Sequence, residues 1–272
     1  MLTRGAWYQR HALDRESRED ALILLQHRLG LTRTQLYLQD HLPLSEQELQ
    51  DLEGYWQQRV EGVPLAYVTG KAGFWGLELE VSPATLIPRP DTETLVSAAL
   101  QVALPDDAQV LDLGTGSGAI ALALASERPH WQIWATDQSA EALSVARRNA
   151  QRHQATIRFF QGDWWQAVEG LKFNLIVSNP PYIAEEDEHL PALMHEPRTA
   201  LVAADQGMAD LRYLINSAGA HMQEGGWLML EHGWQQGATV RDALIQAGWA
   251  EVRTLCDLGS RERMSIGAKH GR

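Results

Sequence analysis

One stretch decides the fold of this chain: Val110-Leu111-Asp112-Leu113-Gly114-Thr115-Gly116-Ser117-Gly118. An apolar run of the kind found in buried strands leads directly into alternating glycines, and residues 119–127 then have the composition of a helix. Because glycine accepts positive φ and has no side chain, such a loop lets a ligand approach the backbone closely. A strand, a glycine-rich loop and a helix in this order are typical of a ligand-binding unit in an open α/β sheet.

The alternation of strands and helices continues on the C-terminal side of this stretch. It predicts parallel strands joined by helices that cover both faces of one sheet. Only a few residues around Gly259 and Ser260 separate the last two strands, too few for a crossover helix, so we expect these strands to pair antiparallel. We expect strands at residues 110–113, 133–136, 157–160, 173–178, 227–230, 252–256 and 264–266, and helices at residues 119–127, 140–152, 208–222 and 238–247.

The first sixty residues indicate a small helical domain. Ser45-Glu46-Gln47-Glu48 forms a capping box, in which the first and last residues bond to each other's backbone N–H, and Thr32-Arg33-Thr34-Gln35 repeats the device. An earlier helix, over about residues 18–29, should end at Gly30, a residue type common just after helices. This segment holds no catalytic constellation, so we expect it to contribute recognition.

A junction of mixed character follows the helical segment. Residues 77–81 alternate between apolar and polar as in a half-buried strand. Residues 86–93 should be rigid and extended because a residue before proline avoids the helical region, and Asp91 or Thr92 can cap a helix that continues to about Ala103. We therefore expect a helical domain at residues 1–63, a linker at residues 64–90 and an α/β domain at residues 91–272.

The composition sets limits on partners and location. The chain has 272 residues and a net charge of −12, and neither its first 63 residues nor the remainder is basic, which argues against duplex nucleic acid as the main partner. No apolar stretch approaches the roughly 20 residues that span a bilayer, the N-terminus shows no signal-peptide core, and Cys256 is the single cysteine, so we expect a cytoplasmic protein. His189, His195 and His232 lack metal-ligand spacing, so no metal is expected.

The glycine loop and Asp137 indicate a cofactor that contains adenosine. Asp137 ends the next expected strand, where a carboxylate can accept hydrogen bonds from both ribose hydroxyls. The pattern Gly114-x-Gly116-x-x-Ala119 also fits a dinucleotide fingerprint loosely, and a diphosphate would favour a helix N-terminus. S-adenosylmethionine carries a positive sulfonium and no phosphate, which suits the nearby Asp112 better. The glycines alone leave the choice of cofactor open.

A second motif, Asn179-Pro180-Pro181-Tyr182, follows the apolar run at residues 173–178. It should therefore lie at the same edge of the sheet as the glycine loop. Because prolines fix φ and lack an N–H, the motif presents acceptors with little competition, namely the Asn179 side-chain oxygen and the Pro180 carbonyl. Two acceptors at fixed spacing suit an NH₂ group, and Tyr182 can lie flat against a planar substrate.

This arrangement of acceptors suits methyl transfer to a planar amide or amine nitrogen. An amide nitrogen is a poor nucleophile because its lone pair is delocalised into the carbonyl group. Holding both hydrogens aligns the nitrogen with the methyl donor, and alignment can contribute several of the ~7–11 kcal/mol available from positioning. The acceptor dipoles also stabilise the positive charge that develops on the nitrogen, so no strong base is required. We therefore predict Asn179, Pro180 and Tyr182 as catalytic residues.

Five motifs, spread over nearly the whole chain, resemble those of the peptide chain release factor glutamine N5-methyltransferases. The resemblance implies a small helical N-terminal domain, a β-hairpin linker and a seven-stranded, Rossmann-like class I methyltransferase domain. The segment between Tyr182 and Glu196 is shorter than is usual in that family. The motifs lie at residues 64–70 (Pro-Leu-Ala-Tyr-Val-Thr-Gly), 86–93 (Leu-Ile-Pro-Arg-Pro-Asp-Thr-Glu), 112–118, 178–183 and 196–201 (Glu-Pro-Arg-Thr-Ala-Leu).

The resemblance also implies a substrate and a role for each residue. The substrate would be the glutamine of the Gly-Gly-Gln tip of class 1 release factors, methylated from S-adenosylmethionine with S-adenosylhomocysteine as product. The enzyme would be a monomer without membrane contact. The ring of Trp164 would stack on the adenine of the cofactor, beside Asp163. The implied cofactor ligands are Gly114, Thr115, Gly116, Ser117, Gly118, Asp137, Trp164 and Asn179, and the implied glutamine ligands are Asn179, Pro180, Pro181 and Tyr182.

Other functions fit parts of the pattern. A glutamine methyltransferase for a ribosomal protein would share both sites, whereas a nucleic acid adenine methyltransferase fits the acidic charge poorly. An NAD-dependent oxidoreductase would share only the glycine loop, and a non-catalytic module would bind cofactor without turnover. Trp164 also fits core packing, Glu231 fits the end of a strand, and Arg89 fits either an ion pair or contact with the substrate.

Overall fold

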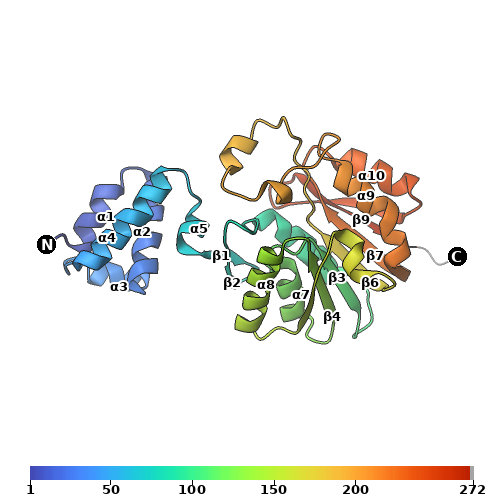
Figure 1. The fold of residues 1–272 in the computed structure, drawn as a ribbon, viewed down its shortest axis with the longest axis horizontal. Coiled ribbons are helices and arrows are strands. Elements are labelled where there is room, and N and C mark those ends of the chain that lie inside the picture. Colours follow the sequence, from blue (N-terminus) through green and yellow to red (C-terminus); the bar gives the residue numbers. More distant parts are fainter. Residues whose placement is uncertain (270–272) are drawn as a thin grey trace. The chain divides into compact units, whose positions relative to one another are not determined.

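The computed structural model describes residues 1–269, whose helices and strands are drawn in Figure 1. The chain divides into two compact units, of which the first is Met1–Gly70 and the second begins at Lys71. The segment that we expected as a linker, residues 64–90, is shared between them. Helix α5 (Leu65–Thr69) belongs to the first unit, and the antiparallel hairpin of β1 (Lys71–Phe74) and β2 (Leu77–Glu80) belongs to the second.

The first unit is a set of short helices around its own apolar core. The capping boxes predicted at Thr32 and Ser45 are both present, and Gly30 ends its helix in the left-handed conformation with φ 65°. A third capping box, which we did not predict, joins Asp14 and Ser17. Helices α1 (Arg4–His11), α2 (Arg15–Leu29), α3 (Arg33–Leu38), α4 (Glu46–Val60) and α5 enclose Trp7, Leu24, Leu36, Leu52 and Val68.

The second unit is built on the seven-stranded sheet that the resemblance implied. Its strand order is β5-β4-β3-β6-β7-β9-β8, so the chain starts in the middle of the sheet, builds one side and then crosses to the other. The strands from β5 to β7 run parallel, and β9 pairs antiparallel with β8, as predicted, and also with β7. The strands are β3 (Gln109–Leu113), β4 (Gln132–Asp137), β5 (Ile157–Gln161), β6 (Phe173–Ser178), β7 (Met222–Glu231), β8 (Ala250–Cys256) and β9 (Glu262–Ala268).

Helices cover both faces of this sheet because neighbouring residues of each strand point to opposite faces. In β3, Val110 packs into one apolar cluster and Leu111 into the other. The first cluster is formed with α6 (Glu93–Gln101), α7 (Ala119–Glu127) and α8 (Ala140–Arg152), and the second with α9 (Ala209–Ser217) and α10 (Gly237–Gln246). Figure 1 shows the two groups of helices on either side of the sheet.

Two predictions about helix ends were wrong. The helix expected at residues 208–222 ends at Ser217, because a 3₁₀ turn at Ala218–His221 leads into β7, which begins at Met222. Two glycines interrupt the apolar pattern of that strand, and its register against β6 shifts between Phe173 and Leu175. Thr92 occupies the N-cap position of α6, but its side chain makes no capping hydrogen bond, and a 3₁₀ turn at Pro90–Thr92 precedes the helix.

The two central strands bring the two predicted motifs together. Leu113, the last residue of β3, pairs with Ser178, the last residue of β6. The hydroxyl of Ser178 donates a hydrogen bond to the carbonyl oxygen of Leu113 at 2.7 Å. The glycine loop therefore leaves the sheet directly beside Asn179, which is the relationship that a shared site requires.

Candidate active site

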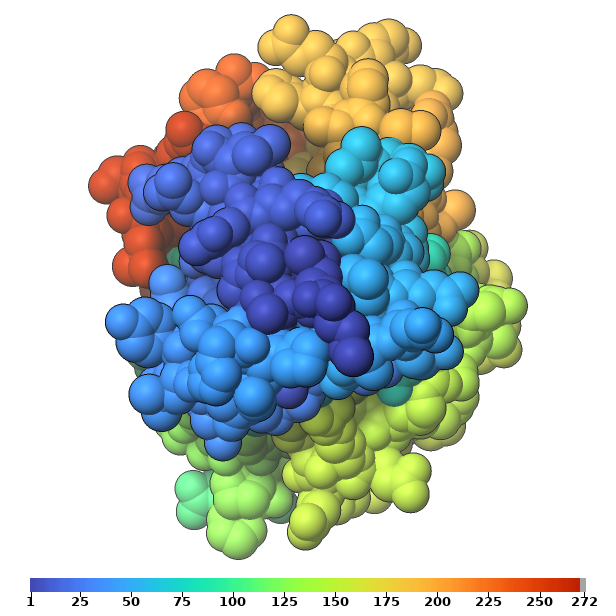
Figure 2. All heavy atoms as spheres, turned by 90° about the vertical axis from the view of Figure 1, so that its left-hand side faces the viewer, coloured from blue at the N-terminus to red at the C-terminus, as the bar shows by residue number. Residues whose placement is uncertain are grey.

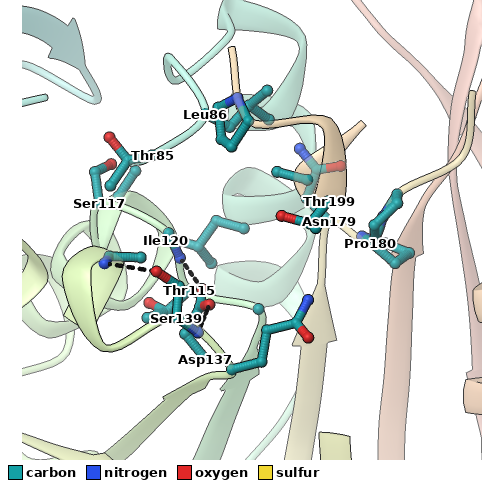
Figure 3. Close-up of a pocket in the computed structure, with 18 of the residues that line it drawn as sticks. Thr85, Leu86, Thr115, Ser117, Ile120, Asp137, Ser139, Asn179, Pro180 and Thr199 are labelled. Carbon is teal, nitrogen blue, oxygen red and sulfur yellow. Dashed lines mark hydrogen bonds between the residues drawn. The ribbon is translucent and has the colours of Figure 1, made fainter. Parts of the chain in front are cut away.

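A cavity of about 330 Å³ lies at the carboxyl edge of the sheet in the second unit. In Figure 3, Asn179 and Pro180 lie on one side of it and Thr85 and Ser117 on the other, with Asp137 below. Of the predicted site residues, those that line the cavity are Gly114, Thr115, Gly116, Ser117, Asp137, Trp164, Asn179, Pro180 and Pro181. Gly118 and Tyr182 do not line it and act from outside its wall.

The glycine loop takes its shape from the neighbouring strand. The backbone N–H groups of Gly114 and Thr115 both donate to the carbonyl of Thr136, each at 2.9 Å. Gly118 adopts φ 84° at the start of α7, and a Cβ there would lie 3.2 Å from the Cβ of Ala146. A side chain at position 118 would therefore meet both backbone strain and helix α8, which explains why this position is glycine although it does not line the cavity.

Asp112 supports the loop from beneath. Its carboxyl group is fully buried and accepts hydrogen bonds from the hydroxyl of Thr115 at 2.6 Å and from the N–H of Ala121 at 3.2 Å. Burial raises the pKa of Asp112 to about 7. The expectation that this carboxylate faces a cationic ligand is not met, because Asp112 is absent from the cavity wall. Its role is to join the loop to α7.

Asp137 lies on the cavity wall at the end of β4, as predicted. One carboxylate oxygen accepts from the N–H of Gly116 and the other from the N–H of Ser139, both at 2.9 Å. These two bonds fix the plane of the carboxylate, and each oxygen keeps acceptor capacity for a ligand. Burial raises the pKa of Asp137 despite these hydrogen bonds. A fixed carboxylate of this kind suits a pair of neighbouring hydroxyl groups.

The Asn-Pro-Pro-Tyr motif divides its side chains between the cavity and the core. The side-chain amide of Asn179 donates to the hydroxyl of Thr92 at 3.3 Å, which leaves the side-chain oxygen of Asn179 as an acceptor. Tyr182 points elsewhere: its hydroxyl donates to Glu231 at 3.1 Å, and its ring packs against the apolar cluster beneath the sheet. The flat contact that we predicted between Tyr182 and a substrate is therefore not prepared in this arrangement.

Two adjacent tryptophans have different environments. Trp164 lines the cavity and its ring lies 3.9 Å from the position that a Cβ on Gly114 would take. Trp165 is buried among the apolar residues, and its indole N–H donates to Ser217 at 2.7 Å. The backbone at Trp164 has φ 46°, an unusual value for a residue other than glycine. This turn places the ring of Trp164 on the cavity wall, where it also packs against the edge of the apolar cluster that contains Trp165.

A wall that we did not predict as part of the site closes the cavity opposite the sheet. It comes from residues 84–89 and 197–200. Buried Glu196 joins the two segments, since its carboxylate accepts from the N–H of Ile87 at 3.0 Å and pairs with the guanidinium of Arg89. The ion pair that we considered for Arg89 is thus present. Residues 86–89 and 197–200 belong to motifs that carried the family resemblance, which was the available signal for them.

The segment before Glu196 forms an exposed lip. It carries a short 3₁₀ turn at Leu190–Leu193, and Met194 is 76% exposed. The lip is coloured gold in Figures 1 and 2 and projects from the surface of the second unit in both views. A protruding segment beside the cavity is a suitable contact for a large substrate.

The charge of the cavity decides between the two cofactors that the glycines left open. Among its lining residues the single basic side chain is Arg89, which is paired with Glu196, whereas three are acidic: Asp137, Glu141 and Asp163. A diphosphate would meet mainly negative charge there, and a sulfonium cation would be favoured. The residues present therefore fit S-adenosylmethionine better than a dinucleotide.

The strand order and this cavity together define an α/β methyltransferase. Residues 91–246 match the family model described as the methyltransferase small domain, and residues 7–70 match the PrmC N-terminal domain. The crystal structure of a methyltransferase from Pyrococcus furiosus has a TM-score of 0.57 and 20% identity, and it covers 80% of this chain and 100% of that chain. At this identity the likeness concerns the fold.

Closer relatives identify the family. The release factor glutamine methyltransferase of Escherichia coli (strain K12) is 50% identical over 254 residues, which cover 92% of this chain and 91% of that protein. The protein of the same name from Xylella fastidiosa (strain Temecula1 / ATCC 700964) is 48% identical over 260 residues, 94% of each chain. The chain belongs to the release factor glutamine methyltransferases, as the motifs predicted.

Two structural features are absent from the described part of the chain. Over residues 1–269, none of the helices combines the length and the apolar character that crossing a bilayer requires. Within the same range, no group of three or more His, Cys, Asp or Glu side chains is arranged to hold a metal ion.

Proposed function

We propose that this enzyme transfers a methyl group from S-adenosylmethionine to N5, the side-chain amide nitrogen, of the glutamine in the Gly-Gly-Gln motif of class 1 release factors. One observation carries the proposal: the acceptors Asn179 and Pro180 line the same cavity as Gly114 and Asp137. The bond between Ser178 and Leu113 holds the two motifs side by side. Family membership supports the glutamine and the release factor as substrate.

The residues of this chain act on the glutamine by holding it. The Asn179 side-chain oxygen and the Pro180 carbonyl each accept one hydrogen of the glutamine NH₂, which orients the nitrogen and raises its electron density. S-adenosylmethionine, when bound, supplies an electrophilic methyl group on its sulfonium. As positive charge develops on the amide nitrogen, the two acceptors stabilise it. The surplus proton leaves to water after transfer, because an N-alkylated protonated amide is a strong acid.

The cofactor is proposed to bind along the glycine loop. The part of this loop that lines the cavity is backbone without bulky side chains, formed by Gly114, Thr115, Gly116 and Ser117. Asp137 and Trp164 both lie on that wall. The Asp137 carboxylate would accept hydrogen bonds from the ribose hydroxyls, and the Trp164 ring would cover the adenine. Gly118 contributes through the shape of the loop, since a side chain there would meet helix α8.

The partners and the location follow from the substrate. We place the enzyme in the cytoplasm, where release factors act, as a monomer that meets its protein substrate through the lip and the helical unit. Duplex nucleic acid is not among the proposed partners, since the net charge of −12 opposes phosphate contacts. The helical unit supplies recognition and no chemistry in this scheme.

A labelling experiment tests the function. Purified enzyme, methyl-labelled S-adenosylmethionine and a class 1 release factor should give one labelled glutamine, located by peptide mass spectrometry. A release factor with the tip glutamine replaced by alanine is the matched control and should remain unlabelled. Equal labelling of that control would refute the substrate. Ribosomal proteins and a bare oligonucleotide in parallel reactions test the two other methyl acceptors.

A further inference from the structure

The side chain of Asn149 is fully buried on helix α8 and takes no part in the proposed reaction. Its oxygen accepts a hydrogen bond from the backbone N–H of Glu80 at 2.7 Å. Its nitrogen donates to the carbonyl oxygens of Glu80 and Ser117, both at 2.9 Å. An asparagine amide has two hydrogens and one oxygen, so every group of this side chain has a partner. Because all three partners are backbone groups, Asn149 fixes the course of the main chain in two places.

The first place is the β1–β2 hairpin. Glu80 is the last residue of β2, and the Asn149 amide pairs with both its N–H and its carbonyl group, as a neighbouring strand would. Ion pairs of Arg148 and Arg152 also join α8 to this strand, but the four side chains involved are 38–51% exposed. Exposed pairs of this kind contribute little, so the buried amide is the main polar link between α8 and the hairpin.

The second place is the end of the glycine loop. Ser117 lines the cavity and is labelled in Figure 3. At the next position, a Cβ on Gly118 would lie 3.2 Å from the Cβ of Ala146, which also belongs to α8. Ala146 and Asn149 are three residues apart and therefore share one face of the helix. Helix α8 thus supports the loop at two adjoining points, by close packing at Gly118 and by a hydrogen bond at Ser117.

One amide group therefore connects a strand outside the cavity to a loop on its wall. No residue of β2 lines the cavity, whereas Ser117 does. A ligand that fixes the Ser117 backbone favours the placement of Asn149 that also bonds Glu80. By the same reasoning, an ordered hairpin favours the ligand-binding form of the loop, because coupling between two sites is reciprocal.

We propose that Asn149 is a positioning residue that holds the glycine loop in its cofactor-binding form and couples this loop to the β1–β2 hairpin. The proposal rests on the proposed cofactor site along the glycine loop, and Asn149 itself touches neither cofactor nor substrate in this scheme. The hairpin begins at Lys71, directly after the helical unit. The coupling lets S-adenosylmethionine stiffen the segment of chain that leads to the proposed recognition unit.

The first test is the cofactor affinity of Asn149→Ala. Without the amide, part of the binding energy must order the loop, so the Kd for S-adenosylmethionine by calorimetry should rise about tenfold or more. The kcat at saturating S-adenosylmethionine should stay within about threefold of the wild type, because the acceptors of the substrate amide are untouched. A structural role alone would lower the unfolding temperature and leave the Kd of the folded protein unchanged. An unchanged Kd therefore overturns the proposal, whatever happens to kcat.

A matched control uses the same substitution at a second asparagine of the same unit. The side-chain oxygen of Asn174 accepts from the backbone N–H of Gln109 at 2.8 Å, and neither residue lines the cavity. Asn174→Ala should keep the Kd for S-adenosylmethionine within about twofold of the wild type. If both variants weaken binding equally, any lost bond between an asparagine and the backbone has this effect, and the positioning role is refuted.

The second test measures the coupling by hydrogen exchange with mass spectrometry. In the wild type, S-adenosylmethionine should slow amide exchange in a peptide that covers residues 77–82 more than in one that covers β8. Neither β2 nor β8 lines the cavity, so β8 reports the general stabilisation by a bound ligand. The excess protection of residues 77–82 should vanish in Asn149→Ala. Equal slowing of both peptides in the wild type overturns the coupling.

The two experiments remain decisive if Asn149→Ala does not fold, because the exchange measurement on the wild type then decides alone. They also separate this proposal from the proposed cofactor site. A wild type that binds no S-adenosylmethionine in calorimetry refutes that site. A wild type that binds it, together with an Asn149→Ala variant of equal affinity, refutes only the positioning role.

Discussion

The carboxylate of Glu196 accepts a hydrogen bond from the backbone N–H of Ile87 at 3.0 Å, although the two residues lie 109 positions apart in the chain. The same carboxylate, whose side chain is 2% exposed, pairs with Arg89. One side chain thus joins the two segments that close the cavity opposite the sheet. This contact therefore helps to set the shape of the cavity.

Replacement of this carboxylate should loosen the wall. Glu196→Gln removes the charge that Arg89 pairs with, and we expect a loss of about 1–3 kcal/mol in the free energy of unfolding together with weaker S-adenosylmethionine binding. Urea unfolding and calorimetry measure the two effects. The control is Glu185→Gln, whose partner Arg198 is 64% exposed, so that its loss should be below about 1 kcal/mol. Equal losses in both variants would contradict the prediction.

Removal of the amide acceptor should abolish most turnover. Asn179→Ala deletes the side-chain oxygen proposed to hold the glutamine, so kcat should fall by about two orders of magnitude or more. The affinity for S-adenosylmethionine should change much less. Asn174→Ala is a suitable control, because Asn174 lies on β6, the strand that Asn179 follows, and its side-chain oxygen accepts from the N–H of Gln109 at 2.8 Å, outside the cavity. Near-normal turnover of Asn179→Ala would remove the proposed orienting role.

The fixed carboxylate of Asp137 should determine cofactor affinity. Asp137→Asn replaces one acceptor oxygen with a donor that faces an N–H group, either that of Gly116 or that of Ser139. We expect the Kd for S-adenosylmethionine to rise about 10- to 100-fold, measured by calorimetry. Glu141→Gln removes an equal charge from the cavity wall without touching those bonds. If both variants weaken binding equally, the charge of the cavity and not the ribose contact is responsible.

Burial of Asp112 should give the stability of the protein a pH dependence. The pKa of this carboxyl is raised to about 7, so the folded protein retains a proton that the unfolded chain releases near pH 4. The resulting stabilisation is fully present below the unfolded pKa and is lost as the pH rises through about 7. Asp112→Asn mimics the protonated form and should lack this dependence.

Urea unfolding at about pH 5 and about pH 8 measures the effect. The difference in free energy of unfolding between Asp112→Asn and the wild type should move in favour of the variant by about 2 kcal/mol over this interval. Glu231, whose pKa is also raised to about 7 by burial, keeps its own share of the pH dependence in both proteins. Parallel pH profiles would show that Asp112 is already ionised when folded.

The local parts of the site could be predicted from the sequence. The glycine loop, Asp137 and the Asn-Pro-Pro-Tyr motif each follow a recognisable strand, and the ends of parallel strands meet at one edge. The order of the seven strands in the sheet could be predicted only through the family resemblance. Periodicity shows which residues are buried, but it does not show which strands pair.

The remaining parts depend on contacts between distant residues. Tyr182 faces away from the cavity because its hydroxyl donates a hydrogen bond to the buried carboxyl group of Glu231, 49 positions later in the chain. Thr92 fits the pattern of a helix cap, yet its hydroxyl accepts from Asn179, 87 positions later. Local propensity describes neighbours along the chain and therefore predicts neither partner.

The pairing of Leu113 with Ser178 restricts how this chain can change in length. Insertion of a single residue into β3 or β6 would turn every later side chain of that strand to the opposite face and displace one motif by about 3.3 Å along the other. Insertions and deletions should therefore be excluded from these two strands and collect in surface loops. The lip between Tyr182 and Glu196 is such a loop, and variation in its length changes the entrance of the site without moving the reacting groups.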